Sequence, residues 1–143
     1  MGALALTAGT AFVVAGSAAW LVVTKQLRAE RIEVPGNAPI FAGQPVQGPV
    51  SAYVEALVIK GNAERGAGGR TFADISAALR GVDAHSYEAR DLRNQSSALS
   101  TAASLRTSLM TSVLAFGVSA LVAGLGLFLT TAATQLLRVG KQS

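Results

Sequence analysis

The sequence predicts an all-α membrane protein in which two transmembrane helices form a hairpin and an extramembrane loop between them holds short amphipathic helices. Two observations predict this fold class. None of the 12 basic and 8 acidic residues lies in residues 1–24 or 107–137. A bilayer core needs roughly 20 apolar residues of helix, because backbone groups in hydrocarbon must be paired within their own segment. Both charge-free blocks are long enough.

The charge pattern divides the 143 residues into four segments. They are transmembrane helix 1 at 1–24, the polar loop at 25–106, transmembrane helix 2 at 107–137 and a short basic tail at 138–143. Such a length is that of one domain. The protein is therefore expected to be a multi-pass protein of the plasma membrane.

The first block is rich in Ala, Gly, Ser and Thr, and Trp20 near its end suits an interfacial anchor. An alternative is a cleaved signal peptide, since residues 15–19 offer small side chains to a peptidase. However, no Lys or Arg precedes the apolar run, and signal cores are usually shorter. We favour a retained span.

The start of the loop holds all 4 prolines and is expected to be extended and rich in turns. From Pro49 an amphipathic helix is expected, with Gly61 as its stop. Thr71 and Asp74 resemble a capping box that opens a second short helix ending before Gly81. The apolar faces of these helices need cover from each other, from lipid headgroups or from a partner. The candidate partner contacts are Tyr53, Leu57, Phe72 and Ile75.

The second block is the more apolar one, with Val, Leu and Phe prominent between Val113 and Leu129. Residues 96–106 are rich in helix-compatible Ala and Leu, so we expect a helix from Ser96 that runs into the span. No ionisable residue lies inside either block, which argues against an ion or proton path through this chain.

Both blocks carry small residues at helical spacing, which lets helices approach closely in lipid. An alternative is that Ala and Gly are simply frequent in this composition. The candidate helix-packing residues are Ala11, Ala15 and Ala19 in the first block and Ala115, Gly117, Ser119, Ala123 and Gly124 in the second.

The net charge is +4 and the pI is near 10.1, but the basic residues do not form a continuous basic stripe. All 8 acidic residues lie in the loop, close to balance with its basic ones, so no nucleic-acid partner is expected. Arg138 and Lys141 favour cytoplasmic termini under the positive-inside rule. The basic residues Lys25, Arg28 and Arg31 favour a cytoplasmic loop instead, but the positive-inside rule is reliable only for loops shorter than this one. We therefore expect cytoplasmic termini and an extracytoplasmic loop.

Few residues offer chemistry. The chain has no Cys and 1 His, whereas catalytic metal sites generally need two or three His or Cys ligands. The segment from Gly61 to Thr71 departs from a phosphate-binding loop, since Glu64 and Arg70 replace the required Gly and Lys. We expect no enzyme activity, catalytic residue, cofactor, metal or small-molecule substrate.

Four stretches carry a family resemblance: QLRAERIE at Gln26–Glu33, FAGQPVQGPVSAYVEALV at Phe41–Val58, GGRTFAD at Gly68–Asp74 and SLRTSLMTSVLAFGVSALVAGLGL at Ser104–Leu127. They resemble a group of two-span actinobacterial membrane proteins often labelled aromatic ring-opening dioxygenase. That label does not suit this chain, because extradiol cleavage needs a two-His, one-carboxylate iron site. The resemblance implies a loop on the outer face, although members often begin with basic residues that residues 1–6 lack.

In size, topology and lack of catalytic residues the chain is also similar in type to small accessory subunits of the actinobacterial cytochrome bcc–aa3 oxidase supercomplex. The leading hypothesis is a non-catalytic accessory subunit of such a respiratory membrane complex. Its expected partners are membrane lipid and larger integral membrane subunits. The alternative is an independent cell-envelope protein whose outer loop binds a surface component or a regulator.

Overall fold

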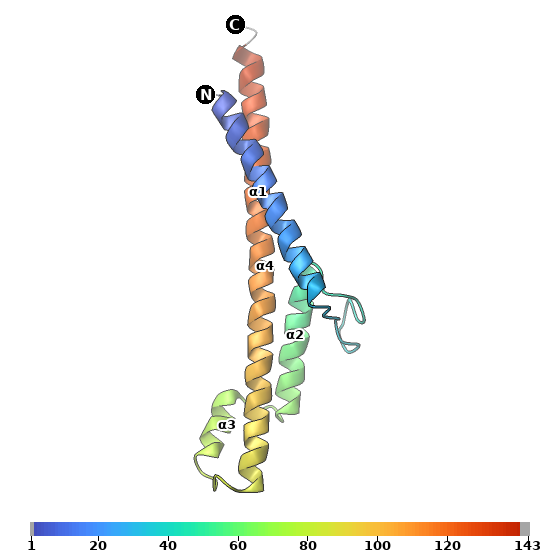
Figure 1. Ribbon diagram of the computed structural model, residues 1–143, viewed down its shortest axis with the longest axis vertical. Helices are drawn as coiled ribbons and strands as arrows, with labels where there is room; N and C mark the ends of the chain where they lie inside the picture. The colour runs from blue at the N-terminus through green and yellow to red at the C-terminus, as the bar shows by residue number, and fades with distance from the viewer. Residues whose placement is uncertain (1, 141–143) are drawn as a thin grey trace. The chain divides into compact units, whose positions relative to one another are not determined.

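The computed structural model describes residues 2–140, and within them the chain is helical. Figure 1 shows the helices α1 (Gly2–Ala29), α2 (Pro49–Gly66), α3 (Phe72–Leu79) and α4 (Tyr87–Gly140). In this described range the only β pairing is one isolated bridge between Glu33 and Pro45. The expected all-α class is confirmed, and α1 and α4 are both long and apolar enough to cross a membrane.

The helices belong to two compact units. The membrane unit, as we name it, contains α1, residues 47–49 and α4 from residue 112 onward. The loop unit contains residues 33–46 and 50–111, and thus α2, α3 and the first part of α4.

In the membrane unit, most of the apolar surface of the two long helices faces outward. Only 11% of the most apolar window of α1 and 17% of that of α4 is buried. The core helix of a soluble protein would be mostly buried instead. Leu4, Leu21, Leu114 and Phe128 are among the exposed large side chains. Helix α1 runs past Thr24 to Ala29, and Arg31 then takes a left-handed conformation with φ of 50°.

Helix α2 begins at Pro49 as expected, but the expected stop at Gly61 is wrong. The helix continues to Gly66, and an ion pair of 2.8 Å between Lys60 and Glu64 spans the glycine. The buried side chains of α2, from Ser51 to Val58, all precede Gly61. The Lys60–Glu64 pair and the cap at the end of the helix therefore help to offset the cost of about 1 kcal/mol for glycine in a helix. The true stop is Gly68 with φ of 63°, where Gly69 N–H donates to the Glu64 carbonyl at 2.8 Å.

The capping box at the start of α3 is confirmed. The Asp74 N–H donates to Thr71 Oγ1 at 3.2 Å, and the Thr71 N–H donates to Asp74 Oδ2 at 2.8 Å. The bond from the Thr71 N–H to the carboxylate contributes most to lowering the pKa of Asp74, and the Thr71 hydroxyl, which donates to Asp74 Oδ2 at 2.7 Å, lowers this pKa further.

Helix α4 is 54 residues long and starts at Tyr87, earlier than the expected Ser96. Its first turn is capped by Ser86, whose Oγ accepts from the Ala89 N–H at 3.0 Å. This cap stabilises the start of the helix in a charged segment for which the hydrophobic pattern predicts no helix. Before α2, residues 33–46 form a tight turn in which Val34 and Val46 are buried and the Val34 N–H donates to the Gln44 carbonyl at 2.9 Å.

Candidate functional site

The closest helix contact in the membrane unit lies between α1 and the C-terminal part of α4, which run in opposite directions (Figure 1). A Cβ placed on Gly16 would lie 2.6 Å from both the Ala123 nitrogen and the Ser119 carbonyl oxygen. A Cβ on Gly9 would lie 2.8 Å from the Gly126 carbonyl oxygen. Real Cβ atoms essentially never approach so closely, so the two backbones touch because these residues are glycines.

The contact follows a seven-residue repeat on both helices. Gly2, Gly9 and Gly16 line α1, while Ser119, Gly126 and Ala133 line α4. A period of seven keeps one stripe facing a partner in a left-handed helix pair. We call these residues, together with Ala123 and Thr130, the α1–α4 interface.

Hydroxyl groups in the α1–α4 interface are satisfied within their own helix. Ser119 Oγ donates to the Ala115 carbonyl at 2.7 Å, and Thr130 Oγ1 donates to the Gly126 carbonyl at 2.8 Å. Unpaired hydroxyls would be costly in an apolar environment. Because these two hydroxyls already donate within α4, they need no hydrogen-bond partner on α1. Close van der Waals packing therefore provides the contact.

An aromatic pair closes the α1–α4 interface at the C-terminal end of the stripe on α1. Trp20 and Phe116 meet edge to face with ring centroids 4.6 Å apart, and Phe116 is buried. Such pairs add about 0.5–1.5 kcal/mol beyond their buried area. Trp20, expected at the membrane interface, thus also has a contact inside the protein.

The structure separates the eight expected helix-packing residues into two groups. Ser119 and Ala123 lie in the α1–α4 interface against Gly16, while Ala115 is half-buried and its carbonyl accepts the Ser119 hydroxyl. The other five are exposed: Ala11, Ala15, Ala19, Gly117 and Gly124. A Cβ added at Gly117 or Gly124 would meet nothing within 4 Å. Sequence reasoning missed Gly9, Gly16 and Gly126, although the spacing of seven between Gly2, Gly9 and Gly16 is visible in the sequence.

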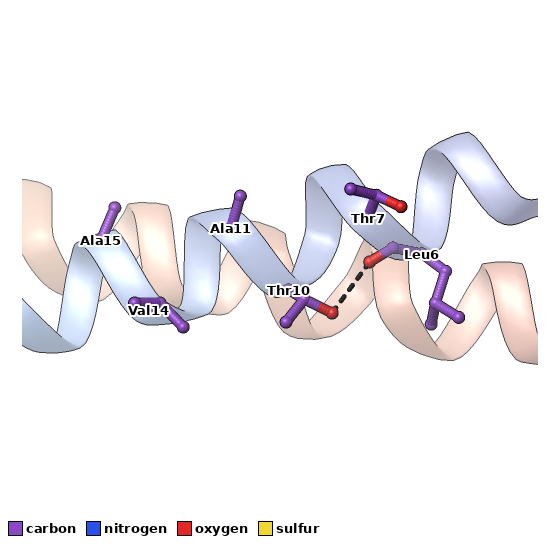
Figure 2. Close-up of a pocket in the computed structure, with 6 residues that line it drawn as sticks. All are labelled: Leu6, Thr7, Thr10, Ala11, Val14 and Ala15. Carbon is purple, nitrogen blue, oxygen red and sulfur yellow. Dashed lines mark hydrogen bonds between the residues drawn. The ribbon is translucent and has the colours of Figure 1, made fainter.

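Two of the exposed alanines, Ala11 and Ala15, line an open groove along α1. Figure 2 shows its lining by Leu6, Thr7, Thr10, Ala11, Val14 and Ala15. The Thr7 and Thr10 hydroxyls donate to the carbonyls of Ala3 and Leu6, so the groove surface is effectively apolar.

The expected partner contacts of the loop also divide. Tyr53, Leu57 and Phe72 are each about half exposed, at 47%, 47% and 53%. Ile75 is fully buried in a small core with Ala67 and Leu92, so its side chain is not exposed to a partner. An apolar face on α3 therefore serves the chain's own packing.

Titratable groups are scattered. In the described part of the chain, no three His, Cys, Asp or Glu side chains lie close enough to hold a metal ion. The His85 N–H donates to Asp83 Oδ1 at 2.9 Å in a local turn. Glu55 of α2 is only 5% exposed, its Oε2 has no hydrogen-bond partner among residues 2–140, and burial raises its pKa.

These features define an all-helical protein with two helices that are long and apolar enough to cross a membrane. No family model, curated protein or solved structure matches the chain.

Proposed function

We propose that this chain is a non-catalytic accessory subunit of a larger membrane complex, and that α1 and α4 form a transmembrane hairpin that docks on larger subunits. The candidate assembly is the actinobacterial cytochrome bcc–aa3 oxidase supercomplex. The likeness in size, topology and lack of catalytic residues to its small subunits supports this choice of assembly.

One observation carries the proposal of a subunit. After α1 and α4 have packed on each other, a second set of small residues remains exposed at Ala11, Ala15, Ala19, Gly117 and Gly124. In lipid, small residues permit close approach of a further helix, while lipid tails give large apolar side chains no reason to associate. The hairpin thus has spare packing surface beyond its own internal contact.

Native purification in mild detergent tests the proposal. The wild-type protein should migrate with a large complex, and mass spectrometry should find cytochrome subunits with it. The triple variant Ala11→Leu, Ala15→Leu and Ala19→Leu adds bulk outside the α1–α4 interface and should be released as a small species. A control with Leu21→Ile and Val22→Leu keeps the exposed bulk and should stay bound. Recovery of the wild type only as a monomer or homodimer would defeat the proposal.

The proposal includes cytoplasmic termini and an extracytoplasmic loop. Gly2 lies beside Leu137, which supports the part of the proposal that puts both ends on one side, while Arg138 and Lys141 favour the cytoplasmic side. Since the chain has no Cys, single cysteines report topology cleanly. A membrane-impermeant maleimide applied to intact cells should label Ser100→Cys in the loop and spare Ser143→Cys. The reverse pattern would place the loop in the cytoplasm.

A second candidate is an independent envelope protein whose loop binds a surface component or regulator. The half-exposed Tyr53 and Phe72 favour it, because exposed aromatic residues often anchor protein contacts, and the half-exposed Leu57 adds apolar surface. Replacing all three with Ser separates the two functions. Loss of a binding event in a protein that never migrates with a large complex would favour this candidate.

A further inference from the structure

A groove of about 430 Å³ runs along α2 in the loop unit. Its walls are mainly apolar, and its two strongly polar residues are Asn37 and Arg65. The lining residues are Asn37, Pro39, Ile40, Val54, Leu57, Val58, Gly61 and Arg65. The size falls within the range of about 300–1,000 Å³ that is usual for small-molecule sites.

The polar residues gather at one end of the groove. Asn62 Oδ1 accepts hydrogen bonds from both Asn37 Nδ2, at 2.8 Å, and Arg65 Nη2. Asn62 therefore holds the two donors together one turn beyond Val58. Within residues 2–140 the ion pair on α2 joins Lys60 to Glu64, and no carboxylate lies within 4 Å of the Arg65 guanidinium. The Arg65 guanidinium therefore has donors left for a ligand and lies at one end of the apolar groove.

Gly61 opens the floor of this groove. It lies in the interior of α2, where glycine costs about 1 kcal/mol relative to alanine, and a Cβ there would meet nothing within 4 Å. No contact inside the protein requires the glycine. What its missing side chain provides is room along the helix between the apolar stretch and Arg65.

We propose that this groove binds one long-chain fatty acid. The alkyl chain lies along Ile40, Val54 and Leu57, crosses Gly61, and places its carboxylate against Arg65 and Asn37. Charge complementarity selects this occupant, because a guanidinium fork matches a carboxylate with two parallel hydrogen bonds, while the rest of the groove offers only apolar contact. This site is separate from the proposed docking of the membrane unit and would stand without it.

Photolabelling of the full chain in phosphatidylcholine nanodiscs tests the site. A palmitate analogue with a diazirine on its chain is activated, and the labelled peptides are identified by mass spectrometry. We expect label within residues 37–40 and 54–65. Excess palmitate should reduce it by about tenfold, whereas hexadecanol at the same concentration should leave it, since the alcohol lacks the charge that Arg65 binds.

Matched variants separate the two halves of the site. Arg65→Gln should lower the labelling about tenfold, Arg65→Lys should retain part of it, and Gly61→Leu should abolish it by filling the groove. Gly66→Leu, at a glycine on α2 that also has open space and does not line the groove, is the control for bulk. Circular dichroism checks that each variant keeps its helix content.

The inference is overturned by any of three results: equal labelling of the wild type and Gly61→Leu, equal competition by hexadecanol and palmitate, or competition by phosphatidylglycerol with none by palmitate. The last result would assign the groove to a two-chain phospholipid.

Discussion

Three glycines set the distance between α1 and α4. At Gly9, Gly16 and Gly126 a Cβ would meet backbone atoms of the opposite helix at 2.8 Å or less. Backbone cannot move aside as a flexible side chain can, so the helices would have to separate. Gly2 differs, because its nearest neighbour is the side chain of Leu137.

Gly16→Ala should therefore destabilise the membrane unit by about 1–3 kcal/mol through overpacking. Gly117→Ala and Gly124→Ala make the same chemical change in open space and should be neutral or stabilising by up to about 1 kcal/mol. Unfolding in mixed SDS micelles, followed by the fluorescence of the single Trp20, measures all three. Equal effects at the three positions would contradict the close contact.

Glu55 should give the loop unit a dependence on pH. Its carboxyl is buried, and burial raises its pKa above the unfolded value. The folded state therefore favours the protonated form. Stability is greatest below the unfolded pKa and falls as the pH rises through the raised pKa.

Glu55→Gln removes the charge at similar size and should be more stable than the wild type at neutral pH. The difference should shrink in acid, where the wild-type carboxyl is protonated. Denaturant unfolding followed by helix content at a series of pH values measures it. A stability difference that stays constant with pH would show that ionisation of Glu55 is not responsible.

At the scale of elements, α3 is short and depends on its cap. Helices of 8 residues are marginal alone, and Thr71 and Asp74 satisfy backbone donors at its start. Thr71→Ala should cost about 0.5–2 kcal/mol and speed hydrogen exchange in residues 72–79. Thr107→Ala, whose hydroxyl donates to the Ala103 carbonyl within α4, is the control and should leave α3 unchanged. Unaltered exchange in the first variant would contradict the role of the cap.

The sequence predicted elements best where a local signal exists. Charge-free length marked both long helices, Pro49 marked the start of α2, and the spacing of Thr71 and Asp74 marked the cap of α3. The end of α2 at Gly66 differs from the expected one because residue type alone does not show which glycine adopts the left-handed conformation, and that glycine is Gly68. The start of α4 had a signal at Ser86 that the apolar pattern obscured.

Which faces of the long helices meet was harder to predict. A membrane helix is apolar all round, so polarity does not mark its buried side. Alanines at a spacing of four drew attention to Ala11, Ala15 and Ala19, but the contact follows glycines at a spacing of seven. Backbone contact depends on a missing Cβ on one helix and on what faces it from the other, and a single helix sequence supplies only the first.

For the whole molecule, α1 and the part of α4 in the membrane unit are long and apolar enough to cross a membrane, and we propose that they lie in lipid. Their apolar windows remain largely exposed after the chain has packed on itself. In water such surface would be unfavourable at roughly 25 cal/mol per Å², which over two helices is a strong drive toward a bilayer.

Alkaline carbonate extraction of membranes from cells that produce the full chain tests this claim most directly. The protein should remain in the membrane pellet after carbonate washing and enter solution only with detergent. A protein released quantitatively by carbonate alone would contradict the membrane account.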